Sequence, residues 1–490
     1  MNSSGRKRIM QRWIRLCQIT LGARGKRNCW NSKKNSGDGI YAGRFTGHAS
    51  SQNSQEQPEI KNCYKQLAMD AEPKHFAFRF LNHFTRITSG GKKFIPQIDG
   101  LRFIAIMAVI AYHVRGICLF HFGANDTSQA TTDLVSRILD TGHLGVPLFF
   151  SISGFILSLP FANERFNQLK PVGLWEYYKR RVTRIEPPYI IHLIFLFLLC
   201  ALIYRRLPLH QQLYQNTGWF EYVWQHLLAS LTYANGFIFG KHPYPNVVLW
   251  SLEVEIQFYI LAPFLARAFL SATKWKRRII LIHSIFLLSL AHLFVEKNNY
   301  FFGFSLLGNL QFFLTGFLLA DLYLTNHLAT QTRNYKWDLL FLLACGTVVG
   351  FHTQPFLPLI LPWLIFACCA AAFRGVICSK VLTSLWVTTI GGMCYTIYLY
   401  HSLIISAVIR LTIGFKTHIL GLDLFIQFLL ITIIIVVICS LLFVLFERPF
   451  MRRNWPTHLR RLFSKKNDLQ LNAEVLGAAK AHDCDPERFK

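Results

Sequence analysis

The sequence predicts an all-α fold: a polytopic membrane helix bundle with about ten transmembrane helices and both termini in the cytoplasm. The first observation is composition, because 52% of the 490 residues are hydrophobic and only 16% are charged. The mean hydropathy is +0.30, which is typical of chains that expose apolar side chains to lipid. The other two observations are the length of the apolar runs and the placement of the charges between them.

The apolar runs are long enough to cross a hydrocarbon core of about 30 Å, which takes about 20 helical residues. They predict ten spans, at 102–120, 142–160, 187–205, 247–269, 279–296, 301–323, 337–353, 356–374, 384–410 and 420–446.

The charges give the orientation of these spans. The chain has 52 Lys and Arg against 25 Asp and Glu, a formal net charge of +27. Basic residues gather at alternate connections, such as 170–184 and 274–278. Because cytoplasmic loops collect Lys and Arg, an even number of spans places both termini in the cytoplasm. The same rule explains the basic charge, so no nucleic-acid partner is expected.

The chain divides by composition into three parts. Residues 1–94 are basic and polar and are expected to form a disordered cytoplasmic extension, in which Lys74–Ile87 could lie on the membrane as an interfacial helix. Residues 95–452 form the membrane domain, and 453–490 a basic cytoplasmic tail. The 12 cysteines show neither a disulfide framework nor zinc-site spacing, so no metal is expected.

The first span, "IDGLRFIAIMAVIAYHV", contains Arg102 and His113. Eleven helical residues correspond to about 16 Å along the axis and nearly the same face. A cation at the cytoplasmic mouth suits a phosphate-bearing ligand, and an imidazole deeper in the span suits a general base. The alternative is an arginine that extends to the interface and a core histidine bonded to a backbone carbonyl.

Two further stretches contain small or basic residues. In "GVPLFFSISGF" (145–155), Ser151, Ser153 and Gly154 favour close helix packing over a catalytic serine. In "YYKRRVTRIEPPY" (177–189), Arg181 and Arg184 lie one turn apart before a proline pair that is expected to open the next span. Membrane anchoring and phosphate binding are equally compatible with these arginines.

The later spans contain carboxylates and a second histidine. In "LWSLEVEIQFY" (249–259), Glu253 and Glu255 point to different faces, and at least one is expected to pair with Arg or His or to line a wet cavity. "CYTIYLYHSL" (394–403) places His401 in a span. "FERPF" (446–450) is interpreted as a structural helix terminus.

In this order, the six stretches resemble the motifs of the acyltransferase 3 family of integral membrane O-acyltransferases, over about residues 95–452. The resemblance is to the stand-alone type without an extracytoplasmic hydrolase domain. The chain departs from the family pattern at Pro147, where Asp is common, and at Glu253, where a small apolar residue is usual.

The resemblance implies transfer of an acyl group, most often acetyl, from cytoplasmic acyl-CoA to a hydroxyl group. The acceptor would be a cell-surface saccharide, such as lipopolysaccharide O-antigen, exopolysaccharide or a lipid-linked precursor. Arg102, Arg181 and Arg184 would hold the phosphates of the donor. His113 would accept the hydroxyl proton or be transiently acylated, and Glu255 would orient His113 or bind the sugar.

The expected substrate cavity is lined by Ser153, Trp250, Ser251, Tyr259, Tyr395, Tyr398 and His401. Acyl-CoA is the expected co-substrate, with no metal. The chain is expected to be a multi-pass protein surrounded by lipid, in the inner (plasma) membrane of a bacterium. Two alternatives stay open: a saccharide or lipid transporter or flippase without bond chemistry, and an acyltransferase that modifies a small secondary metabolite.

Overall fold

The computed structural model describes residues 84–87, 94–122, 132–204, 219–240, 242–295, 300–325, 332–412 and 419–452, together with the single positions 328, 414, 416, 417, 455 and 457. All of them belong to one compact unit, Lys74–Lys490. Most of the expected extension (1–94) and tail (453–490) lies outside the described residues. Of the suggested interfacial helix, only residues 84–87 are described, and they form a turn and a bend.

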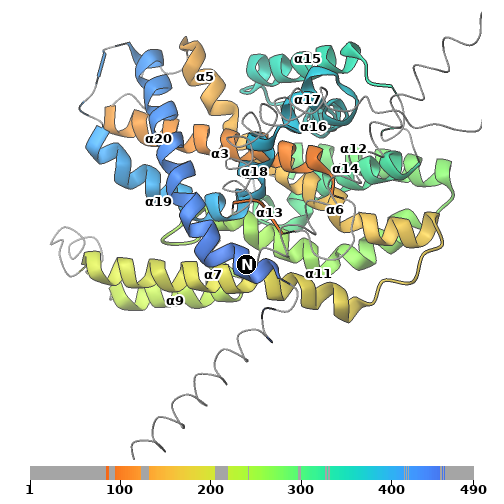
Figure 1. The fold of residues 1–490 in the computed structure, drawn as a ribbon, viewed down its shortest axis with the longest axis horizontal. Coiled ribbons are helices and arrows are strands. Elements are labelled where there is room, and N and C mark those ends of the chain that lie inside the picture. Colours follow the sequence, from red (N-terminus) through yellow and green to blue (C-terminus); the bar gives the residue numbers. More distant parts are fainter. Residues whose placement is uncertain are drawn as a thin grey trace, which may run out of the picture. The chain divides into compact units, whose positions relative to one another are not determined.

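Helices form all the regular structure of the described residues, and Figure 1 labels most of the longer ones. In chain order they are α3 (Pro96–Phe122), α5 (Leu134–Asp140), η1 (Thr141–Leu144), α6 (Gly145–Phe166), α7 (Leu174–Tyr204), α9 (Trp219–Leu231), α10 (Asn235–Phe239), η2 (Val247–Leu249), α11 (Trp250–Leu270), α12 (Lys274–Val295), α13 (Tyr300–Gly303), α14 (Leu306–Leu324), α15 (Tyr335–Phe351), α16 (Leu357–Arg374), α17 (Ile377–Leu382), α18 (Leu385–Gly392), α19 (Cys394–Thr412), α20 (Leu420–Leu442), η4 (Phe443–Glu447) and η5 (Arg448–Met451).

The polytopic helix bundle is confirmed. Nine helical segments among the described residues are long and apolar enough to cross a membrane, and each overlaps one of the ten predicted spans. The remaining prediction, 337–353, corresponds to α15, which has only 17 residues. The predicted cytoplasmic location of both termini stays a prediction.

The start of the third span was predicted wrongly. The proline pair does not open this helix, because α7 begins at Leu174 and continues through Pro187 and Pro188. Proline has no N–H to donate to the carbonyl four residues earlier. For Pro187 that carbonyl belongs to Thr183, and the indole Nε1 of Trp455 donates to it instead at 2.9 Å. The basic stretch is therefore part of the membrane helix.

The prediction of one continuous helix over 384–410 is also wrong, because this segment is divided at Met393 into α18 and α19. The glycines that end α18 are in close contact with neighbouring segments. A Cβ atom added at Gly391 would overlap the backbone carbonyl oxygen of Asp99 at the start of α3. The break therefore lets the end of α18 pack against the first turn of α3.

Helix α3 joins the two apolar cores of the bundle. Its N-terminal part contributes Leu101 and Ala105 to the core formed mainly by α6, α11, α14 and α16. Its C-terminal part contributes Ile110 and Val114 to the core formed with α19 and α20. Arg102 and His113 belong to this same helix, one in the part that packs in the first core and one in the part that packs in the second.

Helices α6 and α14 pack through their backbones. A Cβ atom added at Gly154 would overlap the carbonyl oxygen of Phe313, and one added at Gly316 would overlap that of Ser151. Small residues allow such contact between membrane helices. The expected close packing is therefore observed at Ser151 and Gly154, and the contact fixes the helix from which Ser153 projects.

Gly154→Ala should destabilise the protein by roughly 1–3 kcal/mol, because the added methyl group forces two backbones apart. Gly346→Ala on α15 is the matched control, since a Cβ atom there meets nothing within 4 Å. The control should be neutral or gain up to about 1 kcal/mol of helix propensity. Thermal unfolding of the detergent-purified proteins measures both, and equal midpoints for the two variants would contradict the packing argument.

Candidate active site

Arg102 and His113 project from α3 and are both half-buried. Asp99 lies one turn before Arg102, and its Oδ1 is 2.5 Å from Arg102 Nη1. Because the Asp99 side chain is only 3% exposed, this ion pair is almost dry. The arginine is thus fixed near the start of α3, with the imidazole about 16 Å further along the helix.

His113 faces a second histidine, His401 of α19. The two ring centroids are 5.0 Å apart and the rings are nearly perpendicular. His113 Nδ1 lies 2.9 Å from the carbonyl oxygen of Val109, and His401 Nδ1 lies 2.8 Å from that of Tyr398. A carbonyl oxygen can only accept, so in both rings Nδ1 carries the proton and Nε2 has the lone pair.

The two imidazoles differ in exposure. His401 is fully buried, and its Nε2 has no hydrogen-bond partner within the described part of the chain. His113 keeps some accessible surface. A buried acceptor without a donor is uncommon in folded proteins. The pair therefore offers two neutral proton acceptors, of which His113 is the one that an incoming hydroxyl group can reach.

Tyr398 connects the imidazoles to α11. Its hydroxyl group contacts both the Val248 carbonyl oxygen and Ser251 Oγ. Since the carbonyl must accept, Tyr398 donates to Val248 and accepts from Ser251. Trp250, next to Ser251, packs edge-on against the rings of Phe150 and Phe304.

Glu255 connects α11 to α6. Its Oε1 accepts hydrogen bonds from Ser153 Oγ and from the Tyr259 hydroxyl, the latter at 2.5 Å. We call the five hydroxyl and carboxylate side chains of this region the polar seam: Ser153, Ser251, Glu255, Tyr259 and Tyr398. Four of them are half-buried and Ser251 is buried. The seam joins residues that are about a hundred positions apart in the sequence.

The two carboxylates of α11 have other partners than expected. Among the described residues, neither Glu253 nor Glu255 hydrogen-bonds an arginine or a histidine, so the suggested orientation of His113 by a direct Glu255 contact is not present. Glu253 accepts from the backbone N–H groups of Asn235 and Gly236 at 3.3 and 3.0 Å. This contact holds α10 against α11. It accounts for the carboxylate of Glu253 at a position where the acyltransferase 3 family, which the sequence resembles, usually has a small apolar residue.

The three predicted donor-binding arginines lie together. The Arg184 guanidinium interacts electrostatically with Arg102 and Arg181, and also with Glu447. The Arg181 guanidinium lies 5.2 Å from the centroid of the Tyr177 ring. We call Arg102, Arg181 and Arg184 the arginine cluster. Tyr259 lies near Arg102 and Arg181, so the polar seam adjoins this cluster.

Two carboxylates neighbour the arginine cluster, and sequence reasoning gave neither of them a role in the site. Asp99 pairs with Arg102, and Glu447 accepts from the backbone N–H and the Oγ1 of Thr396 at 3.1 and 2.6 Å. Glu447 ends the last apolar helix, so its position was explained as a helix terminus. The spacing of Asp99 and Arg102, one helical turn apart, was the one available signal.

Tyr395, which was predicted to line the substrate cavity, donates a hydrogen bond to the Ile185 carbonyl oxygen on α7.

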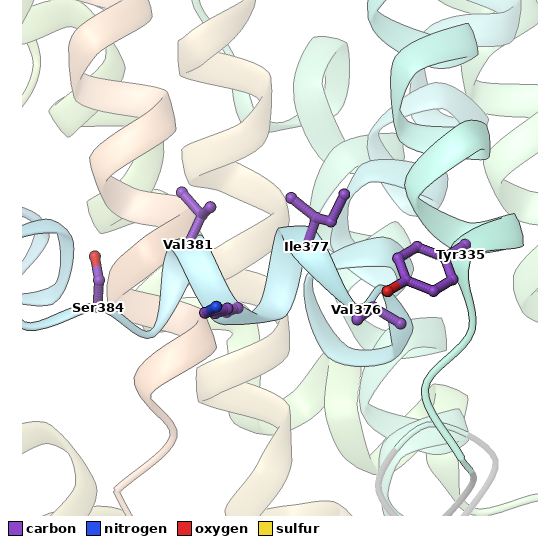
Figure 2. A pocket seen from close by; sticks show the side chains of 6 residues that line it. Tyr335, Val376, Ile377, Val381 and Ser384 are labelled. Atoms are coloured by element: carbon purple, nitrogen blue, oxygen red, sulfur yellow. The ribbon is translucent and has the colours of Figure 1, made fainter.

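A separate surface hollow of about 540 Å³ lies at the ends of α15 and α17. Figure 2 shows Ile377 and Val381 on α17, with Tyr335 beside them on α15. None of the predicted site residues lines this hollow, so it is distinct from the polar seam. Within the described ranges, no group of three or more His, Cys, Asp or Glu side chains could hold a metal ion.

Comparison with protein families gives one match, to a family described as an acyltransferase domain, over residues 95–444. The matched region contains α3 to α20 and every predicted site residue. No solved structure matches the chain.

Comparison with curated proteins gives bacterial relatives. The O-acetyltransferase OatA of Staphylococcus aureus is 28% identical over 240 residues, 47% of this chain and 35% of the relative. The peptidoglycan O-acetyltransferase OatA of Listeria monocytogenes is 27% identical over 197 residues, 39% of this chain and 26% of the relative. The putative peptidoglycan O-acetyltransferase YrhL of Bacillus subtilis is 26% identical over 179 residues. The matches thus cover about a third or less of each relative's length.

The geometry predicts that Asp99→Asn destabilises the protein more than Asp140→Asn. Both carboxylates pair with an arginine of α3, but the Asp99 side chain is 3% exposed and that of Asp140 is 27% exposed. Leaving a buried arginine without its partner costs about 3–5 kcal/mol, whereas a partly exposed pair contributes about 0–1 kcal/mol. Thermal unfolding of the two variants in the same detergent makes the comparison. Similar losses of stability in the two variants would mean that the ion pair of Asp99 and Arg102 is hydrated.

Proposed function

We propose a function from one premise: this chain belongs to the acyltransferase domain family, which matches residues 95–444. It is a multi-pass integral membrane protein with an all-α bundle. The proposed reaction transfers an acetyl group from cytoplasmic acetyl-CoA to a hydroxyl group of a cell-surface saccharide. Acetyl and saccharide are chosen because the relatives are O-acetyltransferases, two of them named for peptidoglycan. A bacterial plasma membrane is the corresponding location.

The observation that carries the proposal is the histidine pair. A sugar hydroxyl group is a weak nucleophile at neutral pH, and a positioned base typically contributes 10²–10⁴-fold to such reactions. His113 has its Nδ1 proton committed to the Val109 carbonyl oxygen, so Nε2 is free to accept. Its partial exposure gives the hydroxyl group access, and buried His401 closes the opposite side.

The proposed step needs no group beyond the two substrates and the imidazole. The acceptor oxygen attacks the thioester carbonyl carbon while His113 Nε2 takes the hydroxyl proton. The tetrahedral intermediate then collapses, the carbon–sulfur bond breaks, and the CoA sulfur leaves with the proton returned by His113. The products are the O-acetyl ester and free CoA, so protons and electrons balance. In the alternative order, His113 Nε2 attacks the thioester carbon and displaces the CoA thiolate; the acceptor oxygen then attacks the acyl-imidazole, the nitrogen–acyl bond breaks, and the hydroxyl proton goes to the thiolate.

The arginine cluster supports an anionic donor. Within the described part of the chain, neither Arg181 nor Arg184 has a carboxylate at ion-pair distance. Guanidinium groups without a carboxylate partner favour phosphate, which they bind through paired hydrogen bonds. The polar seam connects this end to the histidine pair, and its hydroxyl groups at Ser153 and Tyr259 suit a polar acceptor or the pantetheine amides of the donor.

Alanine at His113 should lower thioester turnover by about 10²–10⁴-fold, because the base is lost. His283→Ala is the matched control: His283 Nδ1 makes the same contact with the carbonyl oxygen four residues earlier, at 2.8 Å, but the side chain is exposed on α12. The measurement is release of free CoA thiol from acetyl-CoA by the purified full-length chain with a muropeptide acceptor. The control should keep the wild-type rate.

Two outcomes would reject the proposal. Undiminished turnover in His113→Ala would remove the base from the mechanism. Absence of any CoA release by the wild-type protein, with saccharide or lipid movement into vesicles instead, would favour the transport alternative. The acceptor class is tested separately, by mass spectrometry of surface glycans from cells with and without the gene. Unchanged glycan acetylation would point to a small-molecule acceptor.

A further inference from the structure

Arg86 lies outside the region that matches the acyltransferase family, which begins at residue 95. It nevertheless contacts Asp99, the carboxylate that pairs with Arg102 of the arginine cluster. Arg86 Nη1 lies 3.1 Å from Oδ1 of Asp99, the same oxygen that pairs with Arg102. One carboxylate oxygen therefore holds two guanidinium groups, one from the first membrane helix and one from the segment before it.

The segment 84–87 is attached to the bundle by its neighbours. Phe84 and Ile87 pack against the apolar core formed by α3, α19 and α20. A Cβ atom added at Gly392, at the end of α18, would lie 3.4 Å from the Cβ of Arg86. The Arg86 side chain is only 21% exposed. It is thus held at the cluster from both sides.

The charges around Arg86 do not balance. Burial lowers the pKa of Arg86 to about 9, and the neighbouring guanidinium groups of Arg184 and Arg102 act in the same direction, while Asp99 opposes them. With Arg181, four guanidinium groups among the described residues gather around two carboxylates, Asp99 and Glu447. Like charges in a poorly hydrated place repel strongly, so such an excess calls for an anion.

We propose that Arg86 is the fourth cation of the site that binds the phosphates of the donor, and that the segment 84–87 closes this site. The inference rests on the proposed function, since the anion it assigns is the phosphate-bearing part of an acyl-CoA. It extends that function to a segment outside the family match. The Asp99 carboxylate sets the distance between Arg86 and Arg102, so that both guanidinium groups face one ligand.

The test uses two thioester donors with the full-length protein in detergent. Acetyl-CoA carries the phosphates, and acetyl-pantetheine is a thioester without them. Arg86→Gln should raise the KM for acetyl-CoA about tenfold, the effect of losing one charge-assisted contact. Its kcat should stay within about threefold of wild type, and its kcat/KM for acetyl-pantetheine should equal that of wild type. Arg86→Lys, which keeps the charge, should recover part of the affinity.

Arg180→Gln is the matched control. Arg180 precedes Arg181 on α7, is exposed, and donates from Nε to the Glu176 carbonyl oxygen. The substitution removes the same charge from the protein, so it should leave the KM for both donors unchanged. Equal effects of Arg86→Gln and Arg180→Gln on the KM for acetyl-CoA would overturn the proposal.

Two further results separate the possible failures. Equal losses with acetyl-CoA and acetyl-pantetheine in Arg86→Gln would mean that Arg86 acts only on the fold, which overturns the inference. Binding of CoA alone, followed by the rise in thermal midpoint, gives a readout without turnover and should weaken by the same factor. If wild type turns over neither thioester yet Arg86→Gln weakens CoA binding, the proposed reaction fails while the phosphate site stands.

Discussion

The carboxylate of Asp99 is the contact on which the arrangement of charges at the start of α3 depends. It lies in the first turn of α3, where the helix dipole favours a negative charge. Its side chain holds Arg86 and Arg102, and its backbone carbonyl oxygen is in close contact with Gly391 at the end of α18. Loss of the charge would leave several guanidinium groups in a low-dielectric place with little to hold them. One residue thus links the packing of α18 to the geometry of the arginine cluster.

A second constraint, the backbone contact of α6 and α14, acts on the polar seam. Because Gly154 and Gly316 let the two helices touch, the turn of α6 that carries Ser153 has little freedom to move. Ser153 then reaches Glu255, which also accepts from Tyr259 on its own helix. The two hydroxyl groups hold the Glu255 carboxylate without filling it, since a carboxylate has more hydrogen-bond acceptor sites than two donors occupy. Helix packing therefore positions the Glu255 carboxylate inside an apolar span, where hydropathy alone would not predict a charged group.

Hydropathy predicted most of the fold because lipid imposes a length and an apolar surface on each span. It placed both ends of α3, α11, α14, α16 and α20 within six residues. It failed where contacts with distant residues decide the local structure. The indole of Trp455 donates a hydrogen bond to the carbonyl that Pro187 cannot reach, so the helix continues through the proline pair. The close contact of Gly391 with α3 accompanies a break in a long apolar run. Neither partner can be read from the local sequence, since each lies hundreds of residues away.

The sequence predicted which of these residues lie near one another better than it predicted their contacts. Periodicity places Arg102 and His113 on one helix wall, and the structure brings Arg181, Arg184, Tyr398 and His401 to the same wall. The pairing of Glu255 with hydroxyl groups rather than with His113 depends on the rotation of α11 against α6, which no local pattern encodes.

This arrangement has a consequence for acid–base chemistry. With both Nδ1 atoms committed to carbonyl oxygens, neither imidazole needs a carboxylate to fix its tautomer. A carboxylate partner would favour the doubly protonated ring, which has no lone pair left, whereas the neutral ring keeps the Nε2 lone pair with which it can accept a proton.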